Sequence, residues 1–271
     1  MEGKIGGKIV VDGIKKHFGR GAQALPVVGG VTLSIADGEF VAIVGPSGCG
    51  KSTLMKIISG FEQPDEGEVR IDGVRAHKPS PKGIVISQHG SVFPWLTVQQ
   101  NLMFGLNGDS HGDKAALADH YAEMVGLKGF ENAYPRELSG GMIKRVEIAR
   151  ALVVKPEILY MDEPFSALDA LMNLKMRNEL LRILQEERHT VLLITHDVEE
   201  AIYLADRIMV LSPRPTVIQK TFAVTQPHPR KLSSPELQSL KDAILAELGL
   251  SDGGEKQNNR CAIDQTIKTG T

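Results

Sequence analysis

The stretch "GPSGCGKST" at residues 45–53 decides the fold of this chain. It follows the apolar run "EFVAIVG" at 39–45, which predicts a buried strand, and leads into "KSTLMKIIS", which predicts a helix ending at Gly60. The pattern Gly-x4-Gly-Lys-Ser between a strand and a helix is that of a P-loop. Its glycines let successive N–H groups converge on a polyphosphate, and the helix N-terminus adds roughly half a positive charge. Because every fixed position is present in this context, a turn that merely caps a helix is the weaker interpretation.

A metal site is predicted beside this loop. Lys51 supplies a cation for the β- and γ-phosphates of a nucleotide, and Ser52 offers a hydroxyl to Mg²⁺. The stretch "ILYMDEP" ends an apolar strand with Asp162, which can hold Mg²⁺ through water, and Glu163, which can act as general base for an attacking water. Two adjacent carboxylates are costly in a core unless they are paired or metal-bound. A solvated strand end is the alternative for Glu163.

Three further side chains are candidates for the same site. His196 follows the apolar strand "VLLIT" and is expected to contact the γ-phosphate, because ligands collect at the carboxyl ends of parallel strands. Gln88 follows "IVIS" and can orient water or bind Mg²⁺. Phe18 can stack on adenine, an interaction worth about 1–3 kcal/mol per base. A structural histidine and an ordinary core aromatic are the alternatives for His196 and Phe18.

A second candidate anion site lies in "LSGGM" at 138–142. Ser139, Gly140 and Gly141 combine a hydroxyl, exposed amides and a helix N-terminus. A serine cap followed by flexible glycines is the alternative. The helix that follows is predicted to bury a stripe formed by Met142, Val146, Ala149 and Val153. Its basic residues Lys144, Arg145 and Arg150 are predicted to lie outside this stripe.

The amino-acid composition limits the classes of protein to which this chain can belong. The chain has 271 residues, of which 42% are hydrophobic and 24% charged, and its net charge is −2, so no global basic field argues for nucleic acid. No run approaches the roughly 20 apolar residues of a membrane span, and the first residues lack the apolar core of a secretory signal. Two cysteines, Cys49 and Cys261, give no disulfide framework. We therefore expect a cytoplasmic chain.

Strands and helices alternate along most of the chain, which predicts an α/β fold with parallel crossovers. Between about 97 and 153 the periodicity becomes helical, which predicts a helical insertion. Near the C-terminus, Ser234 and Pro235 start one amphipathic helix, and residues 251–271 have the composition of a disordered tail.

Taken together, "GPSGCGKST", Gln88, "LSGGM", "YMDEP", "SALD" and "ITHD", in this order and spacing, closely resemble the nucleotide-binding subunit of an ABC transporter. The resemblance covers roughly residues 5–250. It implies a P-loop NTPase (RecA-like) α/β core at 5–90 and 155–212 with an antiparallel β subdomain. It also implies an α-helical subdomain at about 91–154 and a C-terminal extension at 213–250.

In that family two ATPase subunits pair head to tail, and the LSGG segment of one closes over the ATP held by the P-loop of the other. The resemblance therefore implies ATP and Mg²⁺ as cofactors, with Asp169 in the loop linking the two sites. The implied catalytic residues are Glu163, His196 and Gln88, and the implied metal residues are Ser52, Gln88 and Asp162. The implied nucleotide-binding residues are Phe18, Gly45, Pro46, Ser47, Gly48, Cys49, Gly50, Lys51, Ser52, Thr53, Ser139, Gly140 and Gly141. The family commonly has Tyr at the place of Phe18 and Gln at that of Met142, and neither change puts ATP hydrolysis in doubt.

The segment "GSVFPWLTVQQNLMFGL" at 90–106 is rich in aromatic residues. It is either core of the helical subdomain or, as the resemblance implies, partly a groove for a helix of separate permease subunits. The forms "FPWLTVQQNLMFGL" and "DEPFSALDALM" look most like the nitrate, sulfonate, taurine and bicarbonate branch of importers, which also use a periplasmic solute-binding protein. This branch implies a peripheral location on the cytoplasmic face of the membrane. The alternatives are an ABC-type ATPase of nucleic-acid repair or translation, and a P-loop phosphotransferase, which leaves "LSGG" unexplained.

Overall fold

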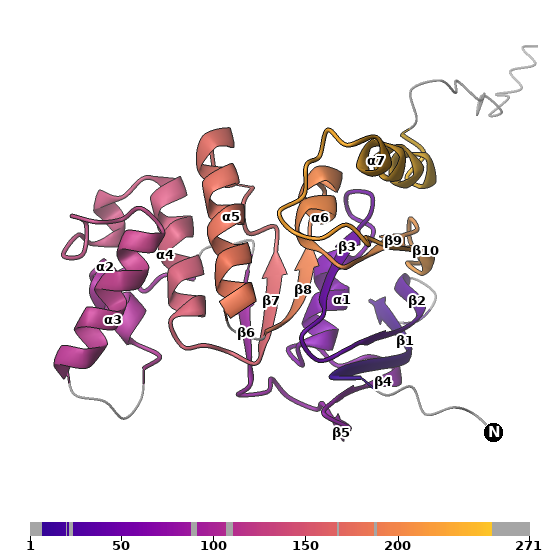
Figure 1. The fold of residues 1–271 in the computed structure, drawn as a ribbon. Helices are drawn as coiled ribbons and strands as arrows, with labels where there is room; N and C mark the ends of the chain where they lie inside the picture. Colours follow the sequence, from indigo (N-terminus) through magenta and orange to yellow (C-terminus); the bar gives the residue numbers. More distant parts are fainter. Residues whose placement is uncertain are drawn as a thin grey trace, which may run out of the picture.

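The computed structural model describes residues 7–19, 21, 24–87, 91–106, 111–166, 168–186 and 189–250. Two sheets share one helix between them, and a group of short helices lies at one end of the molecule (Figure 1). The predictions made for Gln88 and for a disordered tail at 251–271 lie outside the described residues. Within the described ranges, no helix is both long and apolar enough to cross a membrane.

The larger sheet has the strand order β10-β9-β3-β8-β7-β6. Its strands β3, β6, β7, β8 and β9 pair in parallel, and β10 pairs antiparallel with β9. Every residue of β3, β7 and β8 is buried, as their apolar sequences predict. The bounds are Phe40–Val44 for β3, Gly83–Ile86 for β6, Ile158–Asp162 for β7, Thr190–Ile194 for β8, Arg207–Leu211 for β9 and Ile218–Ala223 for β10. Parallel strands end at the same edge, so the loops after β3, β7 and β8 meet there.

The smaller sheet is antiparallel, with the order β2-β1-β4-β5. Helix α1 (Lys51–Ile58) lies between the two sheets, and its residues Leu54, Met55, Ile57 and Ile58 share one apolar core with both. The strands are β1 (Ile9–Phe18), β2 (Leu25–Ile35), β4 (Glu66–Ile71) and β5 (Val74–Arg75). The predicted fold class, an α/β P-loop core with an antiparallel β part and a helical insertion, is confirmed.

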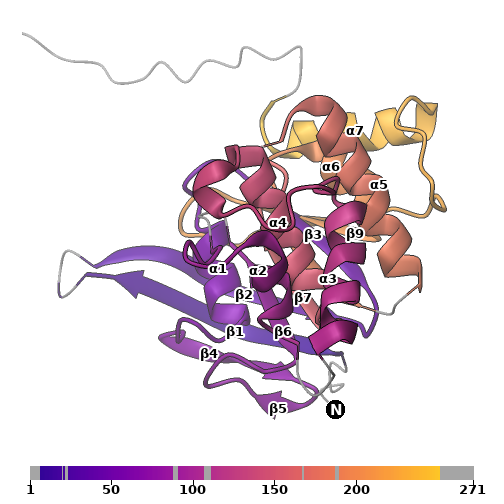
Figure 2. The same ribbon diagram turned by 90° about the vertical axis from the view of Figure 1, so that its left-hand side faces the viewer.

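A second apolar core covers the other face of the parallel sheet. Helices α5 (Ala170–Glu186), α6 (Val198–Leu204) and α7 (Pro235–Glu247) contribute to it, as do the inserted helices α2 (Val98–Met103), α3 (His111–Met124) and α4 (Gly140–Leu152). A 3-10 turn, Pro135–Glu137, precedes α4. The inserted helices face the viewer in Figure 2. As predicted, Ser234 caps α7, where its Oγ accepts a hydrogen bond from the N–H of Leu237.

Three residues of the predicted apolar stripe are buried, since Val146, Ala149 and Val153 are each at most 1% exposed, while Met142 is half-buried against the same core. The expectation that Lys144, Arg145 and Arg150 lie outside the packed face is wrong. Lys144 is 5% exposed, and the two arginines are half-buried.

These three cations tolerate burial because each finds oxygen partners on neighbouring segments. Lys144 Nζ donates to Ser87 O at 2.6 Å and pairs with Glu147 Oε2 at 3.1 Å. Arg145 Nη1 donates to the carbonyl oxygens of Val125 and Gly126, and Arg150 Nη2 donates to Ser91 Oγ at 2.7 Å. The basic side chains on this face of α4 therefore bind the neighbouring segments through hydrogen bonds.

Candidate nucleotide site

The loop between β3 and α1 has the conformation that its glycines predict. Gly48 and Gly50 have φ of 71° and 120°, which side-chain-bearing residues rarely adopt. A Cβ on Gly50 would lie 2.9 Å from Val27 Cγ1, so this position also lacks room for a side chain. Lys51 is 8% exposed, and its Nζ donates to Gly45 O at 2.8 Å and Pro46 O at 3.0 Å. The P-loop thus surrounds the ammonium group of Lys51.

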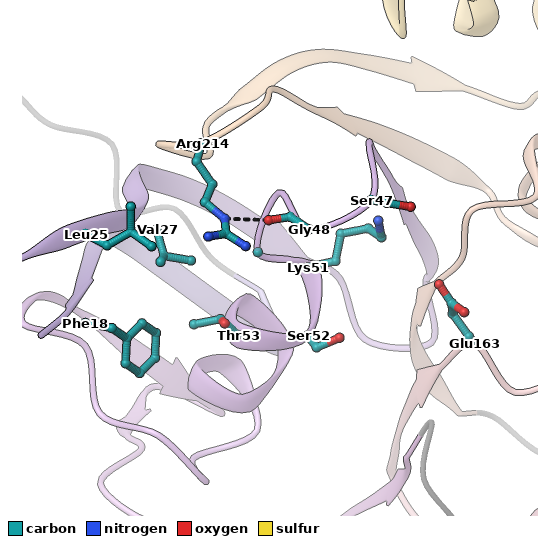
Figure 3. Close-up of a pocket in the computed structure, with 11 residues that line it drawn as sticks. Phe18, Leu25, Val27, Ser47, Gly48, Lys51, Ser52, Thr53, Glu163 and Arg214 are labelled. Atoms are coloured by element: carbon teal, nitrogen blue, oxygen red, sulfur yellow. Dashed lines mark hydrogen bonds between the residues drawn. The ribbon is translucent and has the colours of Figure 1, made fainter.

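A cleft of about 430 Å³ opens beside this loop (Figure 3). It lies within the size range of small-molecule sites. The cleft brings together Phe18, the P-loop and Glu163, which are far apart in sequence. The sequence did not identify Leu25, Val27 or Arg214 as part of it. The full lining is Phe18, Leu25, Val27, Ser47, Gly48, Gly50, Lys51, Ser52, Thr53, Glu163 and Arg214.

Phe18, at the end of β1, lies at the far end of the cleft from Glu163 (Figure 3). It is 43% exposed, so it is not an ordinary core aromatic. Lys16 Nζ lies 5.5 Å from the ring centroid. An exposed ring at the cleft wall is what stacking on a base requires.

Asp162 ends β7 and is 9% exposed. Burial raises the pKa of its carboxyl, while a hydrogen bond with Ser52 opposes that rise. A serine hydroxyl beside a carboxylate is the hard oxygen set that Mg²⁺ takes, and this ion usually completes its shell with water and substrate phosphates. Accordingly, no group of three or more His, Cys, Asp or Glu among the described residues forms a metal cage. The residues present fit Mg²⁺ held jointly with a nucleotide.

Glu163 and His196 meet at the edge of the sheet. His196 Nδ1 lies 3.2 Å from Glu163 Oε1, with 62% of the histidine side chain and 18% of the glutamate side chain exposed. The φ of Glu163 is 49°, a conformation that costs about 1–3 kcal/mol for a residue with a Cβ and that clusters at functional sites. The N–H of Glu163 donates to Ile194 O at 2.9 Å, which ties this backbone to β8. Glu163 is therefore held at the strand end beside His196.

Behind His196 lies a buried polar cluster that the sequence did not reveal. Thr195 Oγ1 donates to Glu200 Oε2 and accepts from the N–H of Asp197, while Arg177 Nη2 donates to Asp197 Oδ2 at 2.8 Å. Glu200 is 4% exposed and lines a cavity of about 180 Å³ that Glu163 and His196 also line. Burial raises the pKa of Glu200 to about 7, and the Thr195 hydroxyl opposes the rise. The backbone on both sides of His196 is held by this cluster.

The segment Ser139, Gly140 and Gly141 lies elsewhere. Ser139 caps α4 by accepting a hydrogen bond from the N–H of Met142 at 3.3 Å, so the capping interpretation is correct as far as it goes. Ser139 and Gly140 are exposed, and none of the three residues lines the cleft of Figure 3. Asp169 is also exposed and accepts from the N–H of Met172. The second candidate anion site is therefore separate from the P-loop cleft within this chain.

The P-loop cleft on a parallel sheet, with carboxylates and a histidine at the strand ends, defines a nucleotide-binding ATPase of the P-loop class. The chain belongs to the ABC transporter family, whose family model matches residues 28–166. This agrees with the resemblance found in the sequence and gives no support to a phosphotransferase.

Relatives and solved structures extend the match over most of the chain. The aliphatic sulfonates import ATP-binding protein SsuB of Bacillus cereus is 41% identical over 239 residues, 88% of this chain and 95% of the relative. An uncharacterized ABC transporter ATP-binding protein of Methanocaldococcus jannaschii is 41% identical over 251 residues, 89% of this chain and 94% of the relative. A solved ATP-binding cassette, a dimer in a post-hydrolysis state bound to ADP and Pi, has 31% identity and a TM-score of 0.73, covering 81% of this chain and 100% of that chain.

Proposed function

We propose that this chain is the ATPase subunit of a multisubunit importer, that it binds ATP together with Mg²⁺, and that it energises uptake of a small solute of the aliphatic sulfonate class. The observation that carries the ATPase assignment is the single cleft in which the P-loop and Glu163 meet, with Asp162 hydrogen-bonded to Ser52. Support for the cargo comes from the 41% identity to a sulfonate importer subunit. Nitrate, taurine and bicarbonate are the alternatives within the same branch.

In the proposed reaction, P-loop amides and Lys51 bind the β- and γ-phosphates. Mg²⁺, held by Ser52 and Asp162, would neutralise charge that develops on the phosphates. Glu163 accepts the proton of the attacking water, and its contact with His196 at 3.2 Å orients it. Phe18 stacks on the adenine. Gln88 keeps its predicted role in orienting water and binding the metal.

A second copy of the chain completes each site in this proposal. Ser139, Gly140 and Gly141 lie at the N-terminus of α4 and do not line their own chain's cleft, so in this proposal they close over the ATP of a partner. Moving such a pair from about 1% to 99% closed needs roughly 5.5 kcal/mol of preferential ATP binding to the closed state. Loss of the γ-phosphate contact on hydrolysis then releases the clamp.

Permease subunits are the second proposed partner. A cleft of about 320 Å³ lies between β6 and the helical insertion, lined by Phe61, Phe93, Phe104 and Arg150 among others. Phe104 and Phe61 are 65% and 63% exposed, and Trp95 nearby in sequence is 69% exposed, whereas Leu102 is fully buried. The aromatic segment thus divides into a core part and an exposed part. The exposed part suits a helix from a permease, with the ATPase peripheral on the cytoplasmic face and a periplasmic protein delivering the solute.

The division of the chain into a core at 5–90 and 155–212, a helical subdomain at about 91–154 and an extension at 213–250 belongs to the same proposal. The inserted helices α2, α3 and α4 share the second apolar core with β3 and β7, which supports a packed, rather than a loosely tethered, subdomain.

The ATPase and the clamp are tested with Glu163→Gln. This variant keeps the shape of the side chain but removes the base, so we expect normal ATP binding, hydrolysis slower by roughly 10²–10⁴, and a dimer in size-exclusion chromatography with light scattering. Lys51→Ala, which lacks the phosphate cation, is the monomeric control. A Glu163→Gln chain that stays monomeric at saturating ATP, alone and with its permease, refutes the clamp.

Composite sites are tested by mixing two inactive chains. Ser139→Arg and Lys51→Ala should together restore one hydrolytic site in a mixed dimer, because the first chain keeps an intact P-loop and the second an intact Ser139. Equal inactivity of the mixture, with mixed dimers demonstrated, contradicts the proposal. The cargo is tested by uptake of labelled ethanesulfonate in cells carrying the wild-type or the Lys51→Ala chain, with nitrate, taurine and bicarbonate as competitors.

A further inference from the structure

The segment from Ser212 to Thr216, here called the strap, joins β9 to β10 and crosses the P-loop. Two of its side chains bind consecutive P-loop carbonyl groups: Arg214 Nε donates to Gly48 O, and Thr216 Oγ1 donates to Cys49 O. The strap is also tied to β2, where the N–H of Thr216 donates to Val27 O at 2.9 Å. It therefore connects the P-loop to the antiparallel sheet.

Glycines allow the strap to lie this close. A Cβ on Gly29 would be 3.1 Å from Pro215 Cβ, and a Cβ on Gly50 would be 3.4 Å from Thr216 Oγ1. Thr216 itself is 0% exposed. The backbone that carries Arg214 is thus packed against the P-loop and β2, and this packing fixes the position of Arg214 in the cleft wall.

The guanidinium of Arg214 retains most of its donors. Its one hydrogen bond within the described part of the chain comes from Nε, and none of the ion pairs among those residues includes it. The side chain is exposed and lines the cleft with Phe18 and Lys51. Figure 3 shows it on the Phe18 side of the P-loop, away from Glu163. The Arg214 guanidinium, which pairs with no carboxylate among the described residues, therefore brings a positive charge to the proposed polyphosphate site.

We propose that Arg214 is a further nucleotide-binding residue, whose terminal nitrogens contact the adenosine-proximal, α-phosphate part of the polyphosphate. The inference rests on the proposed ATP site, in which Glu163 marks the γ-phosphate end and Phe18 the adenine end. Guanidinium groups suit this task because they present several fixed donors to phosphate oxygens. Since the α-phosphate is common to ATP and ADP and is not the reacting group, Arg214 acts on binding and not on the chemical step.

The test compares Arg214→Gln with Arg214→Lys by calorimetric titration of the full chain with MgADP and by steady-state ATPase kinetics. Gln can still donate to Gly48 O but carries no charge, whereas Lys keeps the charge. We expect Arg214→Gln to bind MgADP about tenfold more weakly and to raise the KM for ATP by a similar factor, with kcat within about twofold of wild type. Arg214→Lys should recover part of the affinity. The loss in Arg214→Gln should shrink at high ionic strength, because a charge contact is screened.

Thr216→Val is the matched control for the strap alone, because it removes a bond to the P-loop without changing charge. Unchanged MgADP affinity in Arg214→Gln overturns the proposal, and so does an Arg214→Lys chain as weak as Arg214→Gln, because keeping the positive charge would then recover no affinity. A loss that Thr216→Val reproduces with the same salt dependence also overturns it. A wild-type chain that binds no MgADP overturns this proposal and the proposed function together, while wild-type binding that Arg214→Gln leaves intact overturns this one alone.

Discussion

Glu200 should make the stability of this protein fall as the pH rises through neutrality. Glu200 is 4% exposed, one of its carboxyl oxygens accepts from Thr195, and the other has no hydrogen-bond partner among the residues that the structure describes. Burial raises its pKa from 4.5 to about 7, with the nearby charges of Arg177, Asp197 and His196 acting as smaller influences. At 1.36 kcal/mol per pKa unit, ionising the buried group costs about 3 kcal/mol more than ionising it in the unfolded chain.

The sign follows from proton linkage. Below pH 4.5 both states hold the proton, and the favourable contribution of protonated Glu200 to folding is fully present. Between 4.5 and about 7 only the folded state holds it, so this group's favourable contribution to folding is lost as the pH rises and is gone above about 7. Glu200→Gln cannot ionise and still accepts the Thr195 hydroxyl. Relative to wild type it should therefore gain stability, and the gain should grow by about 2 kcal/mol between pH 5.5 and 8.5.

The measurement is urea unfolding of both chains at several pH values, followed by circular dichroism and checked for equal m-values. Glu199→Gln is the matched control on the same helix, because that side chain is 45% exposed and pairs with Lys241 at the surface. A stability difference between Glu200→Gln and wild type that stays constant with pH, or a variant less stable than wild type at pH 8.5, refutes the reasoning.

Three further outcomes are expected. Lys144→Met leaves Glu147, whose side chain is 1% exposed, without its cation and should cost about 3–5 kcal/mol in urea unfolding, less when Glu147→Leu is added. Gly50→Ala forces a Cβ to within 2.9 Å of β2 at a φ of 120°, and should abolish nucleotide binding in calorimetry and lower stability by about 2–4 kcal/mol. Phe18→Ala should weaken MgADP binding by about 1–3 kcal/mol through lost stacking, whereas Phe18→Tyr should bind within about twofold of wild type.

Local pattern was sufficient to predict the P-loop and the strand ends. A glycine-rich loop between an apolar strand and a helix has few conformations, and a run of buried parallel strands brings the residues after each strand to one edge. Asp162, Glu163 and His196 were therefore predictable from their places after β7 and β8. The contact between them was not predicted: the structure places His196 Nδ1 3.2 Å from Glu163 Oε1, at the edge of the sheet where the sequence placed both.

Features that depend on long-range contacts were not predictable in the same way. Lys144 was assigned to the outer face of α4 because its position on the helix is outside the apolar stripe, yet Ser87, just after β6, approaches that face and supplies a carbonyl oxygen. Periodicity describes one helix and contains no information about what covers its other side. Arg214 and Glu200 were missed for the same reason. Neither residue belongs to a recognisable sequence motif, and each lines its cavity only because the chain folds.

The separation between the two anion sites shows what structure adds to a motif. From sequence, a helix N-terminus with Ser139 and two glycines is a candidate anion site or a simple serine cap, and the family resemblance alone assigns it to a partner. The structure gives this assignment a physical basis within one chain: the cleft is walled by β2, the P-loop, Glu163 and Arg214, while Ser139 remains exposed outside it. Under the proposed function, a nucleotide in the cleft therefore meets the Ser139 segment of a second chain and not that of its own. Because the Ser139 segment does not line the P-loop cleft, the proposed pairing of two chains is the arrangement in which one nucleotide contacts both.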